Sequence, residues 1–129
     1  MYYKGINLKK YRKSGTYLLK DTSRKNLEAN DFHFKRSMSD ADETIYEHII
    51  PVYRYHASVL LEARFLLIHE TGEVRVDVFD SATKGVYAPW YREDSIHSKI
   101  NQIIDMNITK EMNKLGVTEL KEDENATRN

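Results

Sequence analysis

The sequence predicts a small α+β domain, with an antiparallel sheet of about three to five strands packed against two helices. Residues 59–79 are the most apolar and regular part of the chain, and a short Gly-containing connection interrupts them as in a β-hairpin. Residues 40–49 and 95–115 combine helix-start signals with apolar residues at helical spacing. At 129 residues, the chain has the length of one domain and can bury a core without disulfides.

The central hairpin is predicted from alternation in two adjoining segments. Val74, Val76 and Val78 occupy every second position, which is the pattern of a strand with one buried face. Residues 59–68 alternate in the same way, and residues 69–72 (HETG) supply a short connection. A helix is the alternative for residues 59–68, because good helix formers there share one face. That face comprises Ala57, Leu60, Leu61, Phe65 and Ile68.

The first predicted helix covers residues 40–49. Ser39 is a suitable N-cap, and the three acidic residues that follow it lie where the helix dipole favours negative charge. Pro51 should end this helix, because proline disfavours the helical conformation of the preceding residue. The apolar face would contain Ala41, Ile45 and Ile49.

The second predicted helix covers residues 95–115. Asp94 or Ser95 would cap its start, and Gly116 is the natural stop. An apolar stripe at helical spacing runs along it and comprises Ile96, Ile100, Ile103, Ile104 and Ile108.

Shorter elements are predicted around these. The sequence suggests short strands at 15–19, around Phe32 and Phe34, at 52–56 and at 86–88, and a brief helix between Asp21 and Asn30.

Composition limits the class of protein. The chain has no cysteine, which excludes disulfides and thiolate metal sites and fits a reducing compartment. It has no apolar run near 18 residues, and its first residues do not lead into an apolar signal segment. We therefore expect a cytoplasmic protein without a membrane partner.

The basic residues are concentrated near the N-terminus. Residues 1–36 contain ten Lys and Arg against three Asp and Glu, a net charge of +7, while the neutral whole leaves −7 on residues 37–129. We predict a basic, Tyr-bearing, mobile arm at 1–14, a single α+β domain at 15–117 and a disordered acidic tail at 118–129. An anionic partner would explain the charge separation. The alternative is that the basic segment lies on the acidic body of its own protein.

Two stretches are candidates for partner binding. The first is the arm, because Lys and Arg neutralise phosphates and Tyr side chains stack on unpaired bases. The second combines residue types that are enriched in binding hot spots, although Trp90 capping the core beneath the last helix is an alternative. The candidate residues are Lys4, Lys9, Lys10, Tyr11, Arg12, Lys13, Trp90, Tyr91 and Arg92, with Tyr2 and Tyr3 as further aromatic residues of the arm.

Catalytic and metal motifs are not recognisable in the sequence. The five histidines form no HxH or HExxH signature, and the five glycines are scattered singly rather than grouped in a phosphate loop. We therefore predict no catalytic residues, no metal site and no cofactor. The enzyme alternative is a metal-dependent nuclease that would use hairpin carboxylates from the set Glu62, Glu73, Asp77 and Asp80.

The function expected from the sequence is that of a non-enzymatic binding protein. Its partner would be nucleic acid, or a protein that handles nucleic acid and is inhibited or modulated by this chain, such as a host defence or replication enzyme. A small cysteine-free chain with a basic arm, a hairpin and a final helix suits accessory proteins of phages and mobile elements, and this general likeness assigns no residue.

Overall fold

The computed structural model describes residues 16–92 and 98–120. This part of the chain forms six strands, two α-helices and two short 3-10 helices. In chain order they are β1 (Thr16–Leu19), α2 (Arg24–Ala29), β2 (His33–Phe34), η1 (Arg36–Met38), β3 (Ile45–Tyr55), β4 (Ser58–Ile68), β5 (Glu73–Asp80), η2 (Ala88–Tyr91), α3 (Lys99–Leu115) and β6 (Val117–Leu120).

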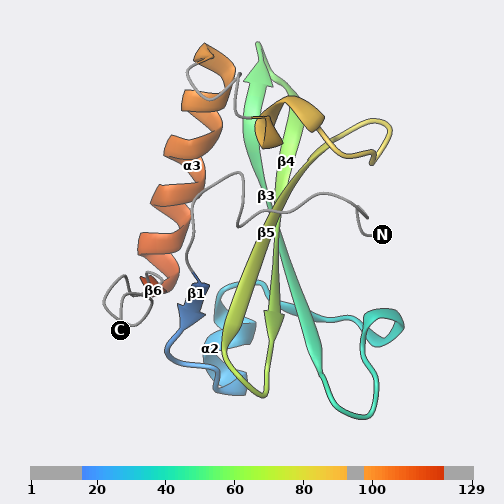
Figure 1. Cartoon of the computed structure of the whole chain (residues 1–129), viewed down its shortest axis with the longest axis vertical. Helices are drawn as coiled ribbons and strands as arrows, with labels where there is room; N and C mark the ends of the chain where they lie inside the picture. Colours follow the sequence, from blue (N-terminus) through green and yellow to red (C-terminus); the bar gives the residue numbers. More distant parts are fainter. Residues whose placement is uncertain (1–15, 93–97, 121–129) are drawn as a thin grey trace, which may run out of the picture.

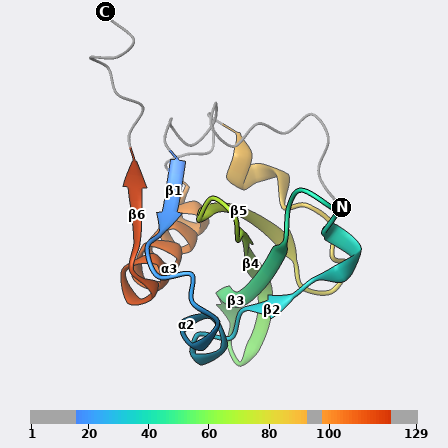
Figure 2. The same ribbon diagram turned by 90° about the horizontal axis from the view of Figure 1, so that it is seen from below.

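All six strands belong to one antiparallel sheet with the order β2-β3-β4-β5-β1-β6. The long strands β3, β4 and β5 form its centre, and α3 runs alongside them (Figure 1). Figure 2 shows β6 beside β1 and β2 beside β3. The predicted architecture is therefore wrong in two respects: the sheet is larger than three to five strands, and α3 is the only long helix in the described part of the chain.

The predicted helix at 40–49 is wrong, because the chain forms a turn and then enters β3. The Asp40 carboxylate does accept two backbone N–H groups as an N-cap would, from Asp42 and Glu43 at 2.8 Å each, but the Asp40 N–H donates to the Glu43 carbonyl and closes a turn. The following residues are rich in β-branched and aromatic types that favour strands. Pro51 is tolerated because β2 pairs only with Tyr46 and Glu47, which leaves Pro51 without a described strand on its outer side.

The predicted central hairpin is confirmed, and residues 59–68 are strand rather than helix. β4 and β5 pair from Leu61 opposite Asp80 to Ile68 opposite Glu73. The tight connection requires Gly72, which has φ +81°. An added Cβ there would also lie 3.1 Å from the Leu19 carbonyl oxygen, so the turn and β1 pack closely.

The predicted C-terminal helix is confirmed over Lys99–Leu115. The Ser98 hydroxyl caps it by accepting the Asn101 N–H at 3.1 Å, and Gly116 ends it in the left-handed conformation. Positions 95–97 of the prediction lie outside the described residues. The chain then continues as β6 to Leu120, so the predicted tail loses its first residues to the sheet, and its remainder at 121–129 lies outside the described residues.

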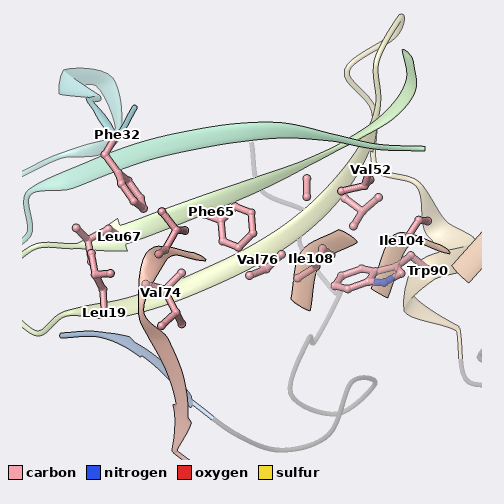
Figure 3. Packing of buried hydrophobic residues seen from close by; sticks show 14 of the residues in the cluster. Leu19, Phe32, Val52, Phe65, Leu67, Val74, Val76, Trp90, Ile104 and Ile108 are labelled. Atoms are coloured by element: carbon pink, nitrogen blue, oxygen red, sulfur yellow. The ribbon is translucent and has the colours of Figure 1, made fainter. Parts of the chain in front are cut away.

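The core lies between α3 and one face of the sheet, which we call the inner face. Phe65, Val76 and Ile104 are fully or almost fully buried there, and Figure 3 shows how side chains of β4, β5 and α3 pack together. The brief helix predicted between Asp21 and Asn30 is present as α2, whose Leu27 joins the same core. Polar contacts also fix α3 in place. They are Asn101 Nδ2 to the Pro89 carbonyl (3.0 Å), Trp90 Nε1 to Asp105 Oδ1 (2.8 Å), Asn107 Nδ2 to the Val52 carbonyl (2.9 Å) and His48 Nε2 with Glu111 Oε2 (2.7 Å).

Candidate functional site

The predicted binding residues of the arm lie outside the described residues. These are Lys4, Lys9, Lys10, Tyr11, Arg12 and Lys13. The structure does show where the arm joins the fold, because Thr16 begins β1. β1 is an interior strand that pairs with β5 on one side and with β6 on the other.

The second predicted binding stretch is largely part of the core. Trp90 and Tyr91 are buried, with ring centroids 4.9 Å apart. The Trp90 indole N–H donates to Asp105 of α3, and the Tyr91 hydroxyl accepts the Val78 N–H of β5 at 2.9 Å. Arg92 is exposed. This arrangement matches the core alternative for Trp90, and the two rings present no exposed hot spot.

The carboxylates of the nuclease alternative do not gather in one place. Glu73 lies 3.7 Å from Arg75, and Glu62 lies 3.5 Å from Lys84. Asp80 accepts the backbone N–H groups of Thr83 and Ala82, and these hydrogen bonds lower the pKa of its carboxyl group. Among the described residues, no group of three or more potential ligands could hold a metal ion. Their geometry is that of structural partners rather than of a catalytic centre.

The face of β3, β4 and β5 that points away from α3, which we call the outer face, carries a row of charges. The Arg64 guanidinium lies between two carboxylates, with Nε 3.3 Å from Asp77 Oδ1 and an Nη atom 3.4 Å from Glu47 Oε2. Glu47 also approaches Lys35, whose ammonium group is 3.5 Å away. We call Lys35, Glu47, Arg64 and Asp77 the charge row.

Asp77 is unusual for a carboxylate on a sheet face, because only 6% of the residue is exposed. Burial raises the pKa of its carboxyl group, and the neighbouring Arg64 acts in the opposite direction. The alternating sequence favoured ion pairs of Glu62 with Arg64 and of Arg75 with Asp77 on a face open to water. The structure instead pairs Arg64 with Asp77, which lies directly opposite it in the register, and Arg75 with Glu73. The expected exposure is also wrong for Arg64 and Asp77, whose side chains are 15% and 9% exposed.

Phe79 continues the outer face beyond the charge row. The ring is 4% exposed and has two cations over it, with Arg64 at 5.4 Å and Lys84 at 5.6 Å from its centroid. Beside it, Glu62 Oε1 is buried and makes no hydrogen bond among the described residues, although the Lys84 ammonium group lies 3.5 Å from it. The outer face therefore contains a buried carboxylate oxygen with unused acceptor capacity.

An apolar pocket lies at the other end of the outer face. It has a volume of about 320 Å³. Ile45, Leu66 and Ile68 form a small buried cluster against which Met38 of η1 packs. The same four residues line the pocket together with the polar residues Ser37, Glu43 and Arg75. A pocket of this kind can receive one apolar or aromatic side chain.

Sequence reasoning missed most of this site. Lys35, Met38 and Lys84 come from loops or a short helix, so no strand or helix period points to them. The buried pair of His48 and Glu111 was also missed, because the two residues are 63 positions apart. Strand alternation at 73–79 was the one available signal, and it identified the outer-face residues of β5.

Comparisons with protein-family models, with curated proteins and with solved structures found no match. Within residues 16–92 and 98–120, no helix has the length and apolar character that a membrane crossing requires.

Proposed function

We propose that this chain is a non-enzymatic binding protein whose basic arm, residues 1–14, binds nucleic acid. The arm holds five basic residues and no acidic one. Lys and Arg neutralise phosphates and release counterions, which supplies most of the affinity of sequence-independent binding. Tyr2, Tyr3 and Tyr11 can stack on unpaired bases, and such stacking tolerates any sequence.

The observation that carries this proposal is the separation of charge between the arm and the rest of the chain. The described residues contain 13 Lys and Arg against 15 Asp and Glu, a net charge of −2. Several of their basic groups already have acidic partners, including Arg24 with Glu28 and Lys35 with Glu47. A polyanion would thus be attracted by the arm and not by the folded body.

The position of β1 gives the arm a fixed base. Tyr17 pairs with Val74 of β5 and with Glu119 of β6, so the chain leaves the sheet from a strand that is held on both sides. A short basic segment on such a base keeps its cations near one region of the molecule.

The nuclease alternative receives no support from the hairpin. Glu62, Glu73, Asp77 and Asp80 each lie near a cation or accept backbone N–H groups, and no three of them come together as a metal-binding group in the described part of the chain. Two-metal and one-metal nucleases need convergent carboxylates around the ion. A binding function uses none of these four side chains.

The experiment compares three forms of the protein with a labelled single-stranded oligonucleotide and a duplex, by fluorescence anisotropy. The first is the unmodified chain. The second replaces the five basic arm residues by Gln and keeps its length and tyrosines. The third is a matched control with the same loss of charge at five exposed positions of the folded body, namely Lys20, Lys25, Arg36, Lys99 and Lys110.

We expect the arm variant to lose at least tenfold in affinity and the control to lose much less. Equal losses in the two variants would show that total charge matters and the arm does not. Failure of the unmodified chain to bind either oligonucleotide would contradict the proposal. In that case, capture of a host protein that survives nuclease treatment and depends on the arm would identify a nucleic-acid-handling protein as the partner instead.

A further inference from the structure

We infer that the basic arm, when no partner is bound, lies across the outer face of β3, β4 and β5 of its own chain. There its cations would meet Glu47, Glu62 and Asp77, and an apolar side chain of the arm would enter the pocket beside Met38. This inference deepens the proposed function, because it assigns to the same arm a resting place that nucleic acid must compete with.

Burial on the outer face is the first observation. Asp77 and Phe79 are both almost fully buried, although α2, α3 and η2 all pack on the inner face. Of the helices that the structure describes, η1 alone contributes to the outer face, through Met38 at the pocket. One face of an antiparallel sheet is ordinarily open to water. Because these values describe the chain alone, burial in the middle of this face indicates a cover that comes from elsewhere in the same chain.

Unused acceptor capacity is the second observation. An ionised carboxylate accepts about four hydrogen bonds. The contacts from Arg64 to Asp77 and Glu47 span 3.3–3.5 Å, longer than the roughly 2.7–2.9 Å of good charge-assisted hydrogen bonds. Glu62 Oε1 is buried without a hydrogen bond among the described residues. These three carboxylates can therefore accept additional Lys or Arg donors without giving up their present partners.

The arm reaches this face from its attachment point. Tyr17 is paired with Val74, so the chain enters β1 beside the part of β5 that carries Arg75 and Asp77. An extended chain spans roughly 3.3 Å per residue, which gives about 46 Å for fourteen residues. Crossing from β5 to β3 requires about 10 Å, because neighbouring strands are about 4.8 Å apart. The arm can therefore cover both the charge row and the pocket.

The composition of the arm fits the two parts of the outer face. Five basic residues meet a row whose carboxylates have acceptor capacity to spare. The pocket has an apolar floor, and the arm offers apolar or aromatic side chains from the set Tyr2, Tyr3, Ile6, Leu8 and Tyr11. Because the arm belongs to the same chain, its effective concentration at this face is high and weak contacts suffice.

Paramagnetic relaxation in the full chain tests the inference. The protein lacks cysteine, so Asn7→Cys gives a single site for a nitroxide label and leaves every charge and tyrosine of the arm in place. At low salt, we expect the amide signals of Arg64 and Asp77 to broaden and those of Lys110, on α3 behind the sheet, to stay sharp. Broadening should disappear when the arm is neutralised by Gln, and it should weaken at 1 M salt, where the screening length is about 3 Å.

Matched variants of the outer face separate charge from fold. Glu62→Gln should reduce the broadening at Arg64 and Asp77, while Glu119→Gln, an exposed carboxylate of β6, should leave it unchanged. Sharp signals for Arg64 and Asp77 in the labelled chain would overturn the inference even if nucleic acid binds. A mixture of nitroxide-labelled chain with isotope-enriched chain that lacks the nitroxide identifies the occupant. Broadening of the isotope-enriched chain's signals would show that a second copy supplies the arm, which would also overturn the inference.

Addition of the oligonucleotide distinguishes this inference from the proposed function. If both hold, the oligonucleotide binds and the outer-face signals sharpen as the arm leaves. If the outer face is broadened but the oligonucleotide neither binds nor changes the signals, the resting place stands and the proposed function fails. If the oligonucleotide binds but the outer-face signals of the free protein are not broadened, the proposed function stands and the inferred resting place fails.

Discussion

Arg64→Ala is the most informative single substitution on the outer face, because it removes the cation that Asp77 and Glu47 share. Removing one partner of a buried ion pair costs about 3–5 kcal/mol, because the remaining charge is left uncompensated. Glu47 keeps Lys35, so the loss falls mainly on Asp77, whose side chain is 9% exposed. The buried carboxylate can escape this penalty by taking up a proton. That option limits the electrostatic cost to about 1.4 kcal/mol for each pH unit above an unfolded pKa of about 3.9.

The limit makes the cost of Arg64→Ala depend on pH. The upper limit on this cost is about 4 kcal/mol at pH 7 and about 1.5 kcal/mol at pH 5. Burial raises the pKa of Asp77 in the folded protein, so the folded state binds this proton more tightly than the unfolded state does. The favourable contribution of the group is therefore present below about pH 4 and is lost as pH rises through the raised pKa. Without Arg64, which opposes that rise, the loss extends further toward neutral pH.

We expect Arg64→Ala to lower the free energy of unfolding by about 3–4 kcal/mol at pH 7 and by about half as much at pH 5. Urea unfolding followed by circular dichroism at the two pH values measures this difference. Arg75→Ala is the control, because its side chain is 60% exposed beside Glu73 and should cost under about 0.5 kcal/mol. A cost for Arg64→Ala that is small, or that is the same at both pH values, would refute the assignment of a buried charge row.

Four further substitutions test the packing and the C-terminal end of α3. Ile104→Ala should cost about 2–5 kcal/mol in unfolding free energy because Ile104 is fully buried, whereas Met106→Ala, at a side chain that is 54% exposed, should change it by less than about 0.5 kcal/mol. Trp90→Phe should cost about 1–3 kcal/mol by removing the hydrogen bond to Asp105, and thermal unfolding would show no such loss if the contact were incidental. Gly116→Ala should cost about 1–2 kcal/mol from backbone strain alone, because φ is +80° and nothing lies within 4 Å of an added Cβ; an unchanged midpoint in urea would contradict that reading.

The sequence was sufficient to predict secondary structure where the apolar periodicity and the signals at the element's ends agree. In α3, the isoleucine stripe and Gly116 indicate one helix, and the structure has it, although Ser98 is its N-cap rather than the predicted Asp94 or Ser95. In β5, the alternating valines indicate a strand that buries its valine face, and the inner-face position of Val74, Val76 and Val78 confirms this. The burial of Asp77 and Phe79 on the opposite face was not predicted. Local preference and tertiary packing point the same way in both elements.

The prediction failed where one local chemistry serves two structures. An acidic segment that begins with Ser and Asp can cap a helix or close a turn, because in both cases the side chain accepts nearby backbone N–H groups. Asp40 does the latter. The residues that follow favour a turn and strand over a helix, because Ile45 and its neighbours pair with β4. Local sequence spacing does not reveal this partner strand. Tertiary pairing therefore overrode the helical pattern at 40–49.

The outer face could be predicted only in part. Alternation placed Glu62, Arg64, Arg75 and Asp77 on one side of the hairpin, and the structure has them there. Two cations reach this face from outside the hairpin, Lys84 beside Glu62 and Lys35 beside Glu47 of β3. Such contacts join positions far apart in the chain, and a spacing rule contains no information about them.

The salt dependence of oligonucleotide binding tests the central claim most directly. Five basic residues on the arm can neutralise at most five phosphates, so log affinity against log salt should fall with a slope no steeper than about −3.5 for a single strand and about −4.5 for a duplex. With the five arm residues replaced by Gln, the slope should approach zero, while the five-site control on the folded body should keep most of it. A slope that persists without the arm cations, or that vanishes only in the control, would contradict the claim that this chain binds nucleic acid through residues 1–14.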